Sequence, residues 1–173
     1  MKRIAILLAA AVVFTTGVFA EKFGPATGST IRIEGTSTLH AWTMEGKTIN
    51  GQVSVAPTVA KALSVDTWTA AGASAATAAV TIPVATIRSE HDRMDRLMAD
   101  ALKAKENPEI RYQMTSASLK ESTAAAFTLR TTGALTIAGV TREIAMDIAG
   151  TRMPDGKYVL AGTAPLKMTD FGV

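Results

Sequence analysis

Apolar and polar residues alternate with a period of two along most of this chain, which is the pattern that half-buried β-strands produce. The strand candidates lie at residues 30–37, 38–55, 79–87, 109–119, 125–137, 140–148 and 157–173, and the alternation is clearest at 31–34, 80–84 and 135–148. Gly46, Gly51 and the Pro-Asp-Gly sequence at residues 154–156 mark turns or bends between or within these runs. The pattern therefore predicts roughly seven or eight antiparallel strands in a mainly β domain.

The sharpest hairpin signal lies at residues 134–148, where Ala138-Gly139 makes a two-residue turn. Apolar residues that alternate within one run are expected on one face of the sheet. These residues are Val80, Ile82 and Val84 in one run, and Leu135, Ile137, Ile144, Met146 and Ile148 in the hairpin. Residues 62–72 carry only a weak strand pattern, and the alanine-rich residues 70–79 indicate a loop that leads into a strand.

Residues 89–107 are the one segment in which the apolar residues follow a helical spacing. Met94, Met98 and Leu102 are four residues apart, and Leu97 and Ala101 extend the same stripe. We therefore predict one amphipathic helix inserted among the strands.

Ser89 is the expected N-cap of this helix, with Asp92 as the acid of a capping box, and Asn107-Pro108 is the expected stop. Such a helix can cover the open end of a barrel, where flexible methionines adapt to an irregular surface. The simpler alternative, which the sequence leaves open, is that Met94 and Met98 are ordinary core residues.

An antiparallel sheet of this size must either pack on a second sheet or close on itself. A barrel of about eight strands is just wide enough to hold one slim ligand. We favour an antiparallel β-barrel with the helix at one end.

The first 20 residues have the pattern of a secretory signal peptide. Lys2 and Arg3 precede an apolar run at residues 4–13, and Val18-Phe19-Ala20 is a small-residue ending of the kind that precedes cleavage. The apolar run is too short for a stable membrane span. The mature domain is therefore expected at residues 21–173, with no membrane span after the signal is removed.

Charge and composition exclude several classes of function. Once Lys2 and Arg3 are removed the chain is close to neutral, so we predict no nucleic-acid partner, because phosphate binding needs clustered basic residues. The chain has no cysteine, and no Gly-x-Ser-x-Gly elbow or glycine-rich phosphate loop is found. His91 and Asp95 lie four residues apart on the helix, but a metal site needs more ligands than these. We predict a non-enzymatic protein with no catalytic residue, no metal site and no cofactor.

Four stretches together resemble the YceI-like family of bacterial secreted proteins, also described as polyisoprenoid-binding or lipid-binding YceI-like domains. They are "GTSTLHAWT" at residues 35–43, "IRSEHDRMDRLMADALKAKENPEIRY" at residues 87–112, "GALTIAGVTREIAMDI" at residues 133–148 and "APLKMTDFGV" at residues 164–173. The resemblance covers essentially the whole mature chain, and it rests on the order and spacing of the stretches.

The resemblance implies a lipocalin-like antiparallel barrel whose hydrophobic cavity holds a long isoprenoid or a related amphiphilic lipid, such as a quinone. It also implies a periplasmic location, and it identifies the helix as the family's insertion near the barrel end. Family members continue past the Asp170-Phe171-Gly172 segment with a closing strand, whereas this chain stops at Val173. If the chain is truncated at this point, the barrel lacks its last strand and has an open seam.

On this basis the first hypothesis is a non-enzymatic periplasmic protein that sequesters or carries a polyisoprenoid or similar lipid. Candidate head-group residues are His40, Trp42 and Arg142, and Arg142 has the strand parity of Ile144. Arg142 can equally be an outward charge beside the hairpin turn. Candidate tail-binding residues are Val80, Ile82, Val84, Leu135, Ile137, Ile144, Met146 and Ile148. Parity alone does not say which face lines the cavity.

The alternative is a filled-barrel structural or interaction protein that binds another protein through a sheet edge, with a homodimer as one form of it. Side-chain volume favours the ligand hypothesis, because the chain is only 5% aromatic and small inward residues leave room inside a barrel.

Overall fold

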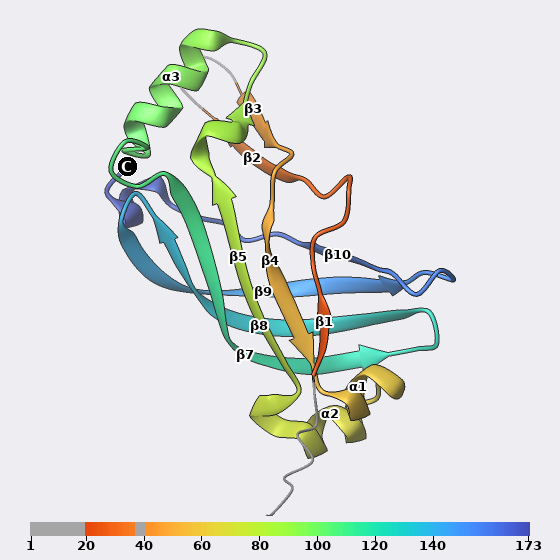
Figure 1. Cartoon of the computed structure of the whole chain (residues 1–173). Coiled ribbons are helices and arrows are strands. Elements are labelled where there is room, and N and C mark those ends of the chain that lie inside the picture. The colour runs from red at the N-terminus through yellow and green to blue at the C-terminus, as the bar shows by residue number, and fades with distance from the viewer. Residues whose placement is uncertain (1–19, 37–40) are drawn as a thin grey trace, which may run out of the picture.

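The computed structural model describes residues 20–36 and 41–173, and in these residues the protein is mainly β, as the alternation predicts. A large antiparallel sheet has the strand order β1-β4-β5-β7-β8-β9-β10 (Figure 1). Its strands are β1 (Glu21–Phe23), β4 (Asn50–Val55), β5 (Ala76–Pro83), β7 (Glu109–Ser122), β8 (Ala126–Ile137), β9 (Val140–Arg152) and β10 (Tyr158–Gly162).

A smaller sheet and several helices complete the described part of the fold. The smaller sheet has the order β2-β3-β6 and is also antiparallel. Its strands are β2 (Ile31–Thr36), β3 (Ala41–Gly46) and β6 (Ile87–Arg88). The α-helices are α1 (Pro57–Lys61), α2 (Val65–Ala71) and α3 (Asp92–Ala101), and the 3-10 helices are η1 (Gly72–Ser74), η2 (Val84–Thr86) and η3 (Met168–Phe171).

The large sheet curls into a half-barrel (Figure 1). Its longest strand, β7, shifts register against β8 between Met114 and Ser116 and again between Leu119 and Glu121, and such bulges bend a strand. β1 and β10 form the two edges, and each pairs with one neighbour only. We call the gap between these two edges the seam. The rings of Phe23 and Tyr158 meet edge to face across it, with 5.5 Å between their centroids.

The predicted hairpin at residues 134–148 is confirmed by β8 and β9. Ile137 pairs with Val140, so Ala138 and Gly139 form the two-residue turn. Both have positive φ, 50° and 81°, which is the conformation that a type I′ turn requires.

Two clusters of apolar side chains fill the ends of the concave face. The first lies under α3, and we call it the α3-side core. Its buried members are Met44, Ile82, Val84, Ile87, Met98, Leu102, Ile110, Leu135 and Phe171. The second, the α2-side core, is smaller, and its buried members are Val59, Trp68, Ala75 and Leu119.

The predicted amphipathic helix is present as α3, but its start, end and buried face differ from the prediction. Its N-cap is His91, and Ser89 instead donates from its backbone N–H (2.7 Å) and its hydroxyl (2.8 Å) to the Asp95 carboxylate. The helix ends at Ala101, well before Asn107-Pro108.

Only the Met94, Met98 and Leu102 row of α3 packs into the α3-side core. Leu97 lies on the other side of the helix and is 60% exposed. Of the two alternatives that the sequence left open for Met94 and Met98, core packing is therefore confirmed. The helix also covers one end of the half-barrel (Figure 1).

Within residues 62–72, where the sequence indicated a weak strand and the start of a loop, the structure has the helix α2 (Val65–Ala71). Ser64 and Thr67 cap this helix reciprocally, with the Thr67 N–H donating to the Ser64 hydroxyl at 3.2 Å. Trp68 is buried and donates its indole N–H to the Ala117 carbonyl of β7 at 3.1 Å. A cap and one buried tryptophan determine this short helix, because seven residues are too few for periodicity to show.

Candidate functional site

The middle of the concave face lies between the two cores, and its side chains are only partly covered. In the register of β9 with β10, Gly150 lies opposite Leu160 and Ile148 lies opposite Gly162. All four residues are on the same face of the sheet as Ile144, which packs against the α3-side core. We call this region the trough and define it by Met114, Thr131, Met146, Ile148 and Leu160. Met114, Met146 and Ile148 are half-buried, whereas Leu160 is 50% exposed.

Small residues make the floor of the trough thin. A side chain at Gly133 would collide with the Tyr112 ring, and one at Gly150 would collide with the Phe127 ring, so both rings lie flat along the sheet. Thr131 is the buried polar residue of the floor, and its hydroxyl donates to the Met146 carbonyl at 3.1 Å. The trough is therefore a largely apolar surface, in which the Thr131 hydroxyl is satisfied by the chain itself.

Two buried polar atoms on this face have no hydrogen-bond partner within the described residues, the Tyr112 hydroxyl and the Arg152 Nε. Tyr112 packs against the α3-side core. Arg152 is the last residue of β9 and lies at the opposite end of the trough, with its guanidinium carbon 5.8 Å from the centroid of the Tyr158 ring. Each buried atom of this kind is costly unless something satisfies it.

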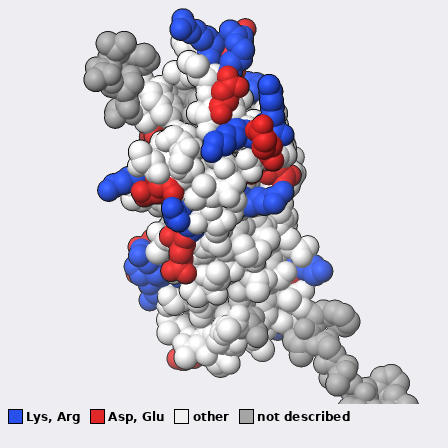
Figure 2. All heavy atoms as spheres, turned by 90° about the vertical axis from the view of Figure 1, so that its left-hand side faces the viewer, with Lys and Arg blue, Asp and Glu red and all other residues white. Residues whose placement is uncertain are grey.

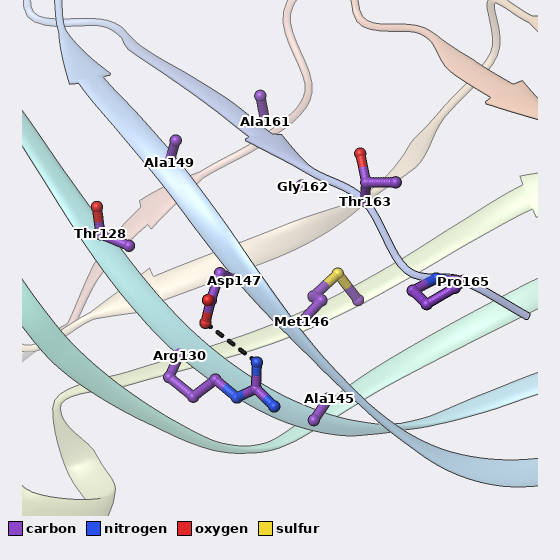
Figure 3. Close-up of a pocket in the computed structure, with 10 residues that line it drawn as sticks. All are labelled: Thr128, Arg130, Ala145, Met146, Asp147, Ala149, Ala161, Gly162, Thr163 and Pro165. Carbon is purple, nitrogen blue, oxygen red and sulfur yellow. Dashed lines mark hydrogen bonds and ion pairs between the residues drawn. The ribbon is translucent and has the colours of Figure 1, made fainter.

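A surface hollow of about 670 Å³ opens beside the trough where β10 separates from β9. β10 pairs with β9 only from Ile148 to Arg152, so the preceding part of β9 has no strand neighbour on that side. Figure 3 shows the Met146 side chain between β9 and the chain that runs from Gly162 to Pro165. The hollow therefore connects the outer surface with a residue of the trough.

Charged groups lie on the outer face of the same strands. Asp147 accepts from Lys120 at 3.0 Å and from Arg130 at 3.3 Å, and the second pair is drawn in Figure 3. The hydrogen bond from Lys120 is the largest cause that lowers the Asp147 pKa. Figure 2 shows basic and acidic side chains interspersed over one side of the molecule, which is the usual appearance of a solvated surface.

The structure divides the predicted tail-binding residues into two groups. Six of them belong to the α3-side core or pack against it: Val80, Ile82, Val84, Leu135, Ile137 and Ile144. Met146 and Ile148 instead lie half-buried in the trough. The packed residues close one end of the concave face, and the other two line its open middle.

The predicted head-group residues do not form one site in the described structure. Trp42 packs against the α3-side core, with its ring over Gly35. Arg142 is exposed, and its Nε–H donates to the Asp170 carbonyl of η3 at 2.9 Å. His40 lies outside the described residues. Arg142 therefore attaches the C-terminal turn to β9.

Sequence reasoning missed Arg152, Tyr158 and Leu160. Arg152 has the parity of Ile148, so extending the alternation by two steps from Ile148 would have placed it on the concave face. No alternation of apolar and polar residues marked Tyr158 and Leu160. β10 is short, and the four residues after Tyr158 are apolar or glycine, so its two faces look alike in the sequence.

Within the described residues, no helix is long and apolar enough to span a membrane. In the same part of the chain, no three or more histidine or acidic side chains come together as a group that could hold a metal ion.

The fold and the trough define an antiparallel half-barrel of the lipocalin-like kind, with an apolar concave face. The family model of the YceI-like domain matches residues 22–173, and the chain therefore belongs to the YceI-like domain family.

A solved structure supports the fold. BcnA of Burkholderia cenocepacia is similar over 83% of this chain and 80% of its own, with a TM-score of 0.62 and 18% identity. The YceI protein of Campylobacter jejuni aligns over 99% of this chain and 77% of its own, with 18% identity, but its TM-score of 0.45 is too low to carry an argument. None of the curated proteins matches this chain.

Proposed function

We propose that this protein is a non-enzymatic binding protein that holds the tail of a polyisoprenoid, a quinone-like lipid or a similar amphiphile in its trough. The observation that carries the proposal is the incompletely covered apolar middle of the concave face. Leu160 points to the inside of the half-barrel and is still 50% exposed, next to half-buried Ile148 and Met146. A soluble protein that exposes apolar side chains inside a concave surface has a surface suited to an apolar ligand.

Burial of the tail supplies the binding free energy in this proposal. Each CH₂ group removed from water contributes about 0.8 kcal/mol, and the contact needs no specific hydrogen bond. Met114, Met146, Ile148 and Leu160 would contact the tail. The predicted residues that pack in the α3-side core would form the closed end at which the tail stops.

We further propose that the protein acts in the periplasm, with the leader at residues 1–20 directing its export. A carrier is needed there because a long isoprenoid tail is insoluble in the aqueous space between two membranes. Membership of the YceI-like family supports this proposal, because the family resemblance implies exported lipid-binding proteins.

The alternative is a protein that binds another protein, or a second copy of itself, through a sheet edge. β1 and β10 each have one strand neighbour, and Val159 on the outer face of β10 is 54% exposed. An unpaired edge with exposed apolar side chains is a known route to strand pairing between chains. A homodimer would be the simplest form.

The first experiment is native mass spectrometry of the protein purified from its own periplasm, followed by solvent extraction of the bound material. We expect one extra mass per chain that extracts as an isoprenoid or quinone. A protein that carries no lipid and does not take up added geranylgeraniol would contradict the proposal, and concentration-dependent dimerisation of that protein would favour the alternative.

Two neighbouring residues of β10 offer a matched pair of variants. Leu160→Glu places a charge in the trough, and Val159→Glu places the same charge on the outer face at similar exposure. We expect Leu160→Glu to weaken geranylgeraniol binding by about tenfold or more, because an apolar tail must then cover a carboxylate. Val159→Glu should bind like the wild type. Equal loss in both variants would place the lipid outside the trough.

A further inference from the structure

We propose that Arg152 is the head-group residue of the trough and that it selects amphiphiles with an anionic head, a phosphate or a carboxylate. This inference rests on the proposed function, because it assigns the polar end of the ligand whose tail the trough would hold. It replaces Arg142, the sequence-based candidate, which is exposed and already donates to the Asp170 carbonyl.

The position of Arg152 places its side chain at one end of the apolar surface. In β9 it follows Ile148 and Gly150 at steps of two, so its side chain emerges on the concave face. Its strand partner is Tyr158, and the next concave pair along the two strands is Gly150 with Leu160. A head group at Arg152 would therefore leave the tail running over Leu160 and Ile148 toward the α3-side core.

The guanidinium of Arg152 has no acidic partner within the described residues. Several other arginines do have such a partner. A side-chain nitrogen lies 3.2 to 3.8 Å from a carboxylate oxygen in Arg32, Arg88, Arg111 and Arg130. Arg152 is half-buried, and its Nε is fully covered without a hydrogen-bond partner. A partly buried charge without an acidic partner is unfavourable, and an anionic ligand that neutralises the guanidinium would offset that cost.

One aromatic side chain, Tyr158, lies beside this guanidinium. The guanidinium carbon is 5.8 Å from the centroid of the Tyr158 ring, a cation–π distance. Tyr158 itself packs edge to face on Phe23 of β1 at 5.5 Å and on Phe127 of β8 at 6.1 Å. The ring that the guanidinium packs on is thus held by side chains of two other strands, which lowers the entropic cost of ordering the cation when a ligand binds.

The chemistry of arginine explains the expected selectivity. A guanidinium offers parallel N–H donors that match two oxygens of a phosphate or carboxylate, and charge-assisted bonds of this kind are the strong ones. An alcohol of the same tail length offers one neutral oxygen and has no negative charge to attract the guanidinium. Selectivity should therefore appear as a difference between two lipids that share a tail.

The test compares geranylgeranyl monophosphate with geranylgeraniol by competition in native mass spectrometry. We expect the wild type to prefer the phosphate by about tenfold or more, which is the size of one charge-assisted hydrogen bond. Arg152→Gln should lose that preference and keep its affinity for the alcohol. Arg152→Lys should retain part of the preference, because the charge remains and the fork geometry is lost.

Two further variants make the result specific. Arg111→Gln removes an arginine from the outer face of β7, where it pairs with Glu109 at 3.2 Å, and should leave the preference unchanged. If Arg142→Gln abolishes the preference and Arg152→Gln does not, the assignment to Arg152 is overturned. If Arg152→Gln weakens binding of both lipids equally, the residue has a structural role and the inference is again overturned.

Failure of this inference can be told apart from failure of the proposed function. Wild type that binds geranylgeraniol but shows no preference for the phosphate would refute the inference and leave the tail-binding trough in place. Wild type that binds neither lipid would refute both. Inorganic phosphate is the third probe, and wild type that binds it as tightly as the lipid phosphate would reassign Arg152 to free anions.

Discussion

Gly51 shows how a single residue can have a role different from the one its type suggests. The sequence indicated a turn or bend, but Gly51 lies inside β4, opposite Val80 of β5. Its φ is 154°, and a Cβ there would stand 2.3 Å from the Ala79 carbonyl oxygen, which is backbone and cannot move aside. Glycine is needed at this position because two strands approach closely, which no local pattern records.

We therefore predict that Gly51→Ala lowers the free energy of unfolding by about 1–3 kcal/mol, the range for forcing extra atoms into a packed site. Urea denaturation followed by circular dichroism measures the change. Gly24→Ala is the matched control, because its nearest atom would be 3.9 Å away, an ordinary contact. Equal stability of the two variants would show that β4 and β5 do not approach as closely as described.

At the scale of elements, α3 illustrates what helical periodicity can and cannot say. The spacing of apolar residues located the helix, yet it assigned five residues to the buried stripe where three are packed. Leu102 is 3% exposed and belongs to the α3-side core, whereas Leu97 is 60% exposed. A short helix that lies over the end of a sheet has room to bury only the row that meets the core.

This difference gives a matched pair of substitutions on one element. We expect Leu102→Ala to lower the free energy of unfolding by about 2–5 kcal/mol, because it removes a buried side chain and leaves a cavity. Leu97→Ala should change stability by less than about 0.5 kcal/mol, as surface substitutions usually do. Thermal and urea unfolding of both variants measure the difference. Similar losses would mean that Leu97 is also packed in solution.

At the scale of the whole molecule, several ion pairs and caps respond to acid together. The pKa values of Asp95, Asp147 and Asp155 are all lowered by folding. The backbone N–H of Ser89 is the largest cause for Asp95, and hydrogen bonds from Lys120 and Lys157 are the largest causes for Asp147 and Asp155. An aspartate whose pKa is lowered by folding stabilises the folded state when the pH is above about 4, its ordinary pKa. This contribution is lost as the pH falls through the lower pKa of the folded state.

We predict that the melting temperature of the wild type exceeds that of Asp95→Asn at pH 6 and that this difference shrinks as the pH falls below about 4. Thermal unfolding between these values measures it. Asp100→Asn removes the charge of an exposed aspartate on the same helix and is the matched control for the loss of one carboxylate. A constant difference for Asp95→Asn would contradict the role of its hydrogen bonds with Ser89.

The open seam is also a property of the whole molecule. The edges β1 and β10 are short, three and five residues, and the side-chain contact described between them is the aromatic one. Short edge strands limit pairing with other chains. Leu160 belongs both to the trough and to the edge strand β10. The trough therefore borders the seam, and the seam leaves Leu160 accessible.

The sequence alone determined the class of fold and much of the inner face. Alternation with a period of two is a local consequence of the strand backbone, so it identified the antiparallel strands, the Ala138-Gly139 hairpin and the shared face of Leu135, Ile137 and Ile144. The helical spacing of Met94, Met98 and Leu102 located α3 for the same reason.

Only the tertiary structure decided which part of that inner face is packed and which is open. Six of the predicted residues, among them Val80 and Ile144, pack in or against the α3-side core because α3 and η3 fold over them. Met146 and Ile148 stay half-buried because no element of residues 20–36 and 41–173 covers them. Arg152 lies beside the Tyr158 ring of β10, and Phe23 of β1 and Phe127 of β8 hold that ring in turn, although both are distant from Arg152 in the sequence. Parity gives the side of a strand, whereas covering and charge partners depend on segments that meet only after the sheet has curled.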